Sequence, residues 1–132
     1  MEKYDQSVEA NSISISYNEF VIYQKCIEAS SAAAVACLRC AKQLREGFKD
    51  GQNIENLDSF SELLFACSSI CLLNLKSLAS ESELSIDVCN NCEEMGVKCE
   101  KECEKYGQFD YCKTTAIACG NCAMECKIIT EM

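Results

Sequence analysis

The stretch CKTTAIACGNCAMEC, residues 112–126, spaces its four cysteines at intervals of seven, three and four residues. Residues separated by these intervals lie on one face of an α-helix, because the helix has 3.6 residues per turn. The segment therefore predicts a helix over about residues 109–130 that carries cysteine along one face. The predicted inner stripe reads Cys112, Thr115, Cys119, Cys122, Cys126 and Ile129.

The segment before it repeats the same pattern and predicts a helix over about residues 83–106. Ser82 is a plausible N-cap, and Gly107 is the expected C-terminal stop. Lysines gather near the end of the helix, where positive charge suits the helix dipole. The inner stripe reads Cys89, Cys92, Gly96, Cys99, Cys103 and Tyr106.

A further helix is predicted over about residues 57–79, with Ser59 and Glu62 as candidate capping residues. The segment at residues 80–85 is short and polar, as expected of a connection. The inner stripe of this helix reads Phe60, Leu64, Cys67, Cys71, Asn74 and Leu78.

The first helix is predicted to start near Ser16, since Ser16 followed by Glu19 matches a capping box. Gly47 and the turn at residues 50–51 are expected to end it. Its stripe reads Tyr23, Cys26, Ser30, Ala33, Cys37, Cys40 and Leu44.

The composition also favours helices, because the chain of 132 residues has no proline and only 5 glycines. Four helices with short connections favour an all-α fold, an antiparallel up-down-up-down four-helix bundle with a cysteine-lined core. The expected domain organisation is an N-terminal tail or arm at residues 1–15 and the bundle at residues 16–132.

The charge of the chain argues against some classes of binding partner. The formal net charge of -9 argues against nucleic acid and against an anionic membrane surface. The first ten residues are acidic and polar and do not resemble a secretory signal. No stretch approaches the roughly 20 apolar residues of a membrane span. A cytoplasmic protein is therefore expected.

Cysteine is the residue that stands out, with 13 copies in a chain that has no histidine. Cytosolic thiols are kept reduced, and an odd number cannot all pair within one chain. All fall on the four predicted stripes, and we predict that all are metal ligands: Cys26, Cys37, Cys40, Cys67, Cys71, Cys89, Cys92, Cys99, Cys103, Cys112, Cys119, Cys122 and Cys126.

Neighbouring cysteines three or four residues apart on a helix are about 5–6 Å apart at Cβ. Thiolate is a soft ligand that selects soft ions, so the hypothesis is storage or sequestration of several Cu(I) ions in the core. An iron–sulfur cluster or a zinc site, with an electron-transfer or structural role, remains an alternative. Without a metal, the many cysteines would be explained by a core of ordinary buried thiols or by interhelical disulfides.

Catalysis has no support in the sequence. General acid–base chemistry near neutral pH most often uses histidine, which is absent. The glycines form no phosphate-binding loop, and the strand–helix context of a thiol oxidoreductase is missing. The protein is therefore not expected to be an enzyme.

Four motifs resemble the Cys-rich four-helix-bundle copper-storage proteins: Cys67-Ser-Ser-Ile-Cys71, Cys89-Asn-Asn-Cys92, Cys99-Glu-Lys-Glu-Cys103 and Cys119-Gly-Asn-Cys122-Ala-Met-Glu-Cys126. The resemblance extends to the first helix through Cys26, Cys37 and Cys40, and leaves residues 1–15 outside. It implies a bundle that stores Cu(I) on inward cysteines and that can associate into tetramers.

The sequence departs from that family's pattern at several stripe positions where relatives often carry cysteine: Ser30, Ala33, Gly96 and Thr115. The open end of the bundle, commonly rich in histidine in relatives, here has Tyr106, Phe109 and Tyr111. These differences imply a divergent member with a thinner thiol lining and a lower capacity.

Overall fold

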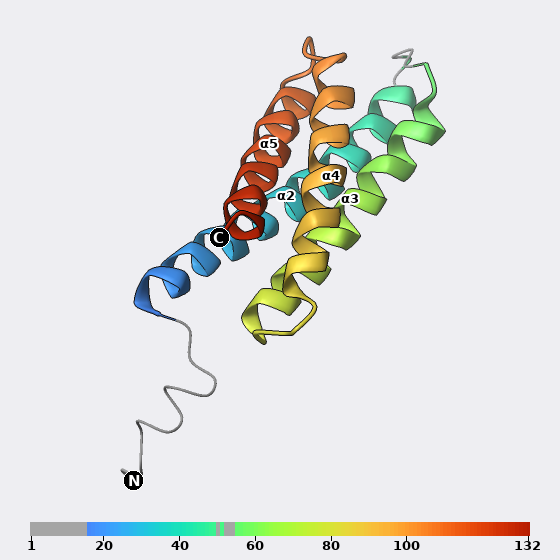
Figure 1. Ribbon diagram of the computed structural model, residues 1–132. Coiled ribbons are helices and arrows are strands. Elements are labelled where there is room, and N and C mark those ends of the chain that lie inside the picture. The colour runs from blue at the N-terminus through green and yellow to red at the C-terminus, as the bar shows by residue number, and fades with distance from the viewer. Residues whose placement is uncertain (1–15, 50, 52–54) are drawn as a thin grey trace, which may run out of the picture.

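The computed structural model describes residues 16–49, 51 and 55–132, and residues 1–15 lie outside this description. Four helices account for almost all of the described part, which has no strand. The helices are α2 (Tyr17–Lys49), α3 (Leu57–Ala79), α4 (Ser85–Glu104) and α5 (Asp110–Thr130) (Figure 1).

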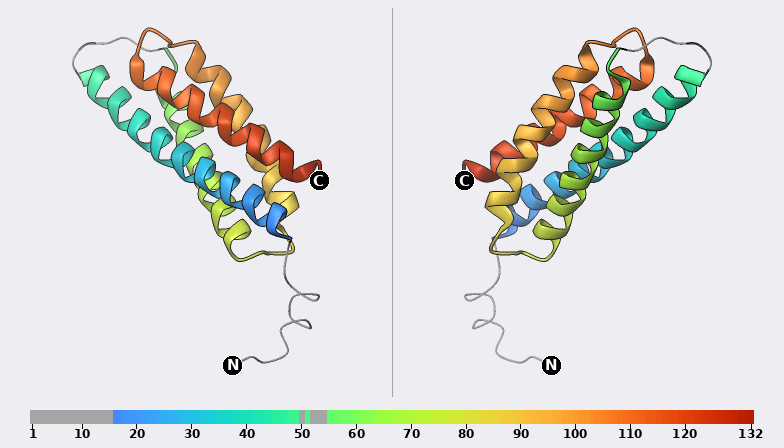
Figure 2. Two further views of the ribbon diagram at one scale, coloured as in Figure 1. Left: turned by 90° about the vertical axis from the view of Figure 1, so that its left-hand side faces the viewer. Right: turned by 90° about the vertical axis from the view of Figure 1, so that its right-hand side faces the viewer.

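The helices pack as an antiparallel up-down-up-down bundle, which confirms the predicted fold class. Within the described residues, each helix contacts its neighbours in chain order, and α5 closes the ring against α2. The backbones of the diagonal pairs stay apart across the described part of the chain, and these helices meet through side chains at the centre, such as Cys67 of α3 and Cys119 of α5. Two side views show the long α2 running beside both α3 and α5 (Figure 2). A single channel is therefore surrounded by all four helices.

Local sequence explains where the first helix begins. The Ser16 hydroxyl accepts a hydrogen bond from the Glu19 N–H at 3.1 Å, and the Glu19 carboxylate accepts one from the Ser16 N–H at 2.9 Å. This reciprocal pair is the predicted capping box. Of the two predicted stop signals, Gly47 lies inside α2, which continues to Lys49, directly before the turn expected at residues 50–51.

The other boundaries differ from prediction by at most two residues. Helix α3 has the predicted range, but its N-cap is Asn56 in the left-handed conformation (φ 57°), without a side-chain capping bond. Ser59 and Glu62 lie inside the helix and do not cap it. Ser82 accepts a hydrogen bond from the Leu84 N–H at 3.1 Å, immediately before α4 begins at Ser85.

The predicted inner stripes form the core. Every stripe residue is buried except Tyr23 and Tyr106, which are half-buried. The largest buried side chains lie toward the two ends of the channel: Leu44, Phe60 and Leu64 at one end, and Leu78 and Ile129 at the other. Cysteines fill the space between them.

Helix α3 is long and apolar enough to cross a membrane by length and composition, with a mean hydropathy of 1.4 over its best window. This differs from the expectation that no stretch of the chain would qualify. A core helix of a soluble bundle has the same composition, and α3 packs between α2 and α4 with its inner stripe buried.

Candidate metal centre

All thirteen cysteines are fully buried, and none forms a disulfide. Each helix contributes at least two of them, so the sulfur atoms of four separate helices meet in one channel. The structure therefore places every predicted ligand in the interior.

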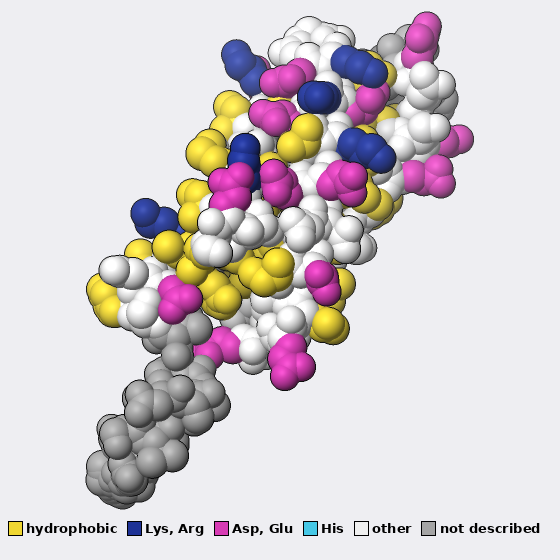
Figure 3. Space-filling model, viewed as in Figure 1, with side chains coloured by type: hydrophobic (Ala, Val, Ile, Leu, Met, Phe, Trp, Pro, Cys, Tyr) yellow, Lys and Arg dark blue, Asp and Glu magenta, His cyan; other side chains and the backbone are white. Residues whose placement is uncertain are grey.

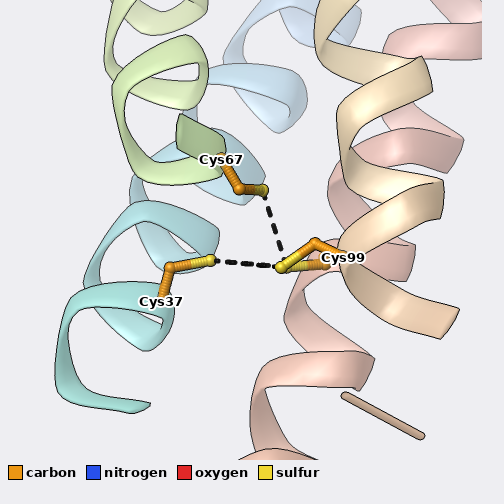
Figure 4. A group of neighbouring side chains, drawn as sticks. Cys37, Cys67 and Cys99 are labelled. Carbon is orange, nitrogen blue, oxygen red and sulfur yellow. Dashed lines mark hydrogen bonds between the residues drawn. The ribbon is translucent and has the colours of Figure 1, made fainter. Parts of the chain in front are cut away.

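The largest group combines one cysteine from each helix: Cys37, Cys67, Cys99 and Cys119. Their four sulfur atoms all lie within 4.8 Å of one another. The Sγ–Sγ distance is 3.6 Å from Cys37 to Cys119, and 3.9 Å from Cys67 to Cys119. Figure 4 shows the side chains from α2, α3 and α4 pointing toward one another. The group is shaped to surround an ion.

Two further groups continue along the channel toward the C-terminal end of α5. The first, Cys71, Cys92 and Cys122, has Sγ–Sγ distances of 3.7 to 3.9 Å. The second comprises Cys26, Cys89 and Cys126. Within each group the three sulfur atoms lie within 4.8 Å of one another.

The three remaining cysteines, Cys40, Cys103 and Cys112, lie at the opposite end of the thiol lining. The Sγ atoms of Cys40 and Cys112 are 3.8 Å apart, and the Cys40 thiol also interacts with that of Cys103. We call the four sets, in order along the channel, the port group (Cys40, Cys103, Cys112), the four-thiol group, the middle group (Cys71, Cys92, Cys122) and the far group (Cys26, Cys89, Cys126).

Asn74 completes the far group with an amide instead of a fourth thiol. Its Nδ2 donates to Ser30 Oγ at 3.0 Å and to the sulfurs of Cys126 and Cys26 at 3.4 and 3.5 Å. Its Oδ1 accepts from the Cys89 thiol at 3.1 Å. The sequence placed Asn74 on the inner stripe but gave it no role, and its position among cysteines was the available signal.

At two of the four stripe positions where relatives often carry cysteine, the residue present makes specific polar contacts. Ser30 Oγ lies 3.6 Å from Cys122 Sγ, so it takes the fourth place in the middle group. Thr115 instead donates its hydroxyl to the carbonyl oxygens of Tyr111 and Ala36. Of this pair, only Ser30 replaces a sulfur within a group.

Gly96 and Ala33 are both buried, and a side chain at Gly96 would be tightly packed. A Cβ atom at Gly96 would lie 3.1 Å from the Cys119 carbonyl oxygen and 3.3 Å from Ala123 Cβ. Contacts that short are tighter than ordinary van der Waals separation, so a cysteine there would require α4 and α5 to move apart slightly.

The thiols perturb one another's ionisation. One in each group has a lowered pKa, because hydrogen bonds from neighbouring thiols stabilise its thiolate despite burial: Cys40, Cys67, Cys89 and Cys122. The pKa of Cys37 is raised because its proton is shared with Cys119 and then because burial disfavours charge. Each group therefore favours one thiolate surrounded by S–H donors.

Aromatic and aliphatic side chains close the end beyond the port group. The rings of Phe60 and Tyr106 stack at 5.0 Å, and those of Phe109 and Tyr111 at 5.4 Å. The Tyr106 hydroxyl donates to the Glu55 carbonyl at 3.1 Å. The channel is therefore covered at this end by apolar packing.

A bundle whose channel is lined by free, buried thiols in groups of three and four has the construction of a thiolate metal-binding protein. The family model described as copper storage protein matches residues 21–131. The chain belongs to the copper storage protein family, as the resemblance of its cysteine motifs indicated.

Three relatives illustrate the similarity. The Cu(I)-bound copper storage protein BsCsp3 has a TM-score of 0.74 at 27% identity, over 83% of this chain and 98% of that chain. The protein Nmul_A1745 from Nitrosospira multiformis has a TM-score of 0.70 at 29% identity, over 83% and 95% of the two chains. The cysteine-rich protein YhjQ of Bacillus subtilis (strain 168) is 30% identical over 105 residues, 79% of this chain and 92% of its own.

Proposed function

We propose that this chain stores or sequesters several Cu(I) ions on the thiolates of its thirteen inward cysteines. The observation that carries the proposal is the continuous series of four thiol groups, in which sulfur atoms from separate helices approach within 3.6 to 3.9 Å. Soft thiolates select Cu(I), and a thiolate that bridges two ions lets neighbouring groups share ligands. The Cu(I)-bound relative supports the choice of metal.

The proposal includes the setting of the protein. A core of reduced thiols suits the cytoplasm, where thiols are kept reduced. We propose copper ions as its partner, neither nucleic acid nor membrane, and no catalytic activity. Exposed apolar side chains on the outer faces of the helices offer contact surfaces for a homo-oligomer, with the family resemblance favouring a tetramer: Leu38, Ile86, Ile117 and Ile128. Figure 3 shows apolar side chains along α5 beside mixed charges over α4.

Anaerobic titration of the reduced apoprotein with Cu(I) tests this function. We expect binding of several equivalents per chain, with Cu–thiolate absorption in the ultraviolet and release of protons as thiols become ligands. A titration of the unfolded chain with all thiols alkylated controls for copper binding that does not use sulfur. Saturation at one equivalent or fewer would refute storage.

The four-thiol group favours a second candidate, a single Zn(II) or iron–sulfur site. A tetrahedral Zn–thiolate site with bonds of about 2.3 Å has sulfur atoms about 3.8 Å apart, close to the distances among Cys37, Cys67 and Cys119. This candidate leaves the other three groups unexplained. It predicts one tightly bound Zn(II), or a brown iron–sulfur protein, with no further equivalents of Cu(I).

A further inference from the structure

A groove on the side of the bundle reaches the port group, while the adjoining end of the channel is packed shut. The groove lies between α2 and α5 and has a volume of about 710 Å³. Cys40 lines it together with Ala36, Arg39, Gln43, Asp110 and Thr114. Cys40 itself is fully buried, so a ligand in the groove reaches its thiol when neighbouring side chains move aside.

The groove has the size and chemistry of a small-molecule site. Its volume lies within the range of about 300–1,000 Å³ that is common for ligand pockets. Small residues such as Ala36 give it depth, and Arg39 and Asp110 add charges of both signs. A free copper ion needs no such space, whereas a copper ion with a small organic ligand does.

We propose that the α2–α5 groove is the port for copper and that it receives Cu(I) as a complex with an anionic low-molecular-weight thiol. This proposal rests on the proposed storage function. The Arg39 guanidinium pairs with a carboxylate of the small thiol, and the copper ion is directed to Cys40 at the groove floor.

Transfer at Cys40 is a ligand exchange with no change in oxidation state. The bond from Cu(I) to Cys40 Sγ forms as the bond from Cu(I) to the sulfur of the small thiol breaks. Cys40 forms this bond as a thiolate, and the sulfur of the small thiol leaves as a thiolate that takes up a proton from the solvent, so the charge balances. Cys112, whose Sγ is 3.8 Å from that of Cys40, then becomes the next ligand.

The port is tested by the rate of copper uptake, measured as the growth of Cu–thiolate absorption after rapid anaerobic mixing of the apoprotein with the Cu(I)–glutathione complex. Ala36→Phe places a ring in the groove, and Ala66→Phe places the same ring on an exposed position of α3 outside it. We expect uptake at least tenfold slower in Ala36→Phe only, with an unchanged number of ions at equilibrium. Thr114→Phe fills the groove from an exposed position on α5 and should slow uptake likewise if Ala36→Phe fails to fold.

Two further variants separate the port from other routes and identify the ligand. Tyr106→Ala opens the packed end and should not accelerate uptake. Arg39→Gln should slow uptake from Cu(I)–glutathione but not from the complex with uncharged β-mercaptoethanol.

The proposal that copper enters through the groove would be refuted by equal uptake rates in wild type, Ala36→Phe and Thr114→Phe. Faster uptake in Tyr106→Ala would refute it as well. Equal effects of Arg39→Gln on both complexes would overturn the anionic ligand. Absence of copper at equilibrium in the wild type would instead refute the storage function itself.

Discussion

Ser30 and Asn74 are the two buried polar side chains that occupy fourth places among the thiols. The 3.0 Å hydrogen bond from Asn74 Nδ2 to Ser30 Oγ joins the far group to the middle group. Neither side chain is a soft ligand, so each lowers the number of sulfur atoms available to copper at that level of the channel. Both are satisfied by hydrogen bonds, so they do not destabilise the core as unpaired polar groups would.

Ser30→Cys tests the effect of the missing sulfur. The side chains have similar size, so we expect a folded protein that loses about 1 kcal/mol from the weakened bond to Asn74. The middle group gains a fourth thiol, which should raise Cu(I) capacity by about one ion per chain. Capacity is measured by anaerobic titration and elemental analysis. Ser31→Cys adds an exposed thiol on the next residue as a control, and equal gains in both variants would contradict the prediction.

The burial of the individual cysteines could be predicted from sequence, but their grouping could not. Helical periodicity places Cys67 and Cys71 on one face, because that relation is local. The meeting of Cys37, Cys67 and Cys119 depends on how far each helix is shifted along its neighbours, which no local pattern encodes. The role of Asn74 could not be predicted for the same reason, since its hydrogen bonds reach residues of α2, α4 and α5.

The close contact between α4 and α5 is made possible by small residues on both helices. Gly96 lies against the backbone of Cys119 and the side chain of Ala123, whereas Gly120 faces the flexible carboxylate of Glu100. The two glycines therefore have different structural roles in the same pair of helices. Gly96 sets the separation of the helix backbones, and Gly120 only leaves room for a side chain that can move.

Substitution of each glycine by alanine should reveal this difference. Alanine in a helix interior gains up to about 1 kcal/mol over glycine. At Gly96 the contact with the Cys119 carbonyl cannot relax without moving a helix, and overpacking of this kind costs about 1–3 kcal/mol. Gly96→Ala should therefore lower the melting temperature of the apoprotein. Gly120→Ala, in which Glu100 can turn away, should leave it unchanged or raise it, and equal effects at both sites would contradict this account.

Helix existence was predictable in every case, whereas the ends depended on contacts that the pattern did not reveal. The capping box at Ser16 and Glu19 is local and was found. Gly47 resembles a stop signal but lies inside α2, where it is buried against the bundle. At Asn56 a left-handed residue starts α3 without a side-chain cap, so Ser59 had no capping role to fill.

Viewed as a whole, the apoprotein holds a core that is poor in large apolar side chains. Each buried cysteine removes less apolar area from water than leucine or isoleucine would, so the bundle depends on Leu44, Leu64, Leu78 and Ile129 near the channel ends. Ions that bind only the folded state add their binding free energy to its stability. The protein should therefore be much more stable with copper than without it.

The stability of the apoprotein should fall as the pH rises above about 8.5, where thiols of an unfolded chain lose their protons. Protons shared with neighbouring thiols, and then burial, raise the pKa of most thiols in the folded state, including Cys37, Cys71 and Cys126. The folded state then keeps protons that the unfolded state releases, which costs about 1.4 kcal/mol per pH unit for each such proton. The thiols with lowered pKa values act below that pH instead: they are already ionised in the folded state, so they raise stability as the pH approaches about 8.5 and add no further change above it.

Anaerobic denaturant unfolding from pH 7 to pH 9.5 measures this dependence in the apoprotein. The copper-loaded protein is the matched control, since its ligands are already thiolates in the folded state. Its stability should instead fall at acid pH, where protons compete with Cu(I) for sulfur. An apoprotein whose stability stays constant or increases between pH 8.5 and pH 9.5 would show that the buried thiols ionise as readily in the folded chain as in the unfolded one. Ionising the closely spaced thiols in the channel would then carry no extra free-energy cost, and copper binding would have no such cost to offset.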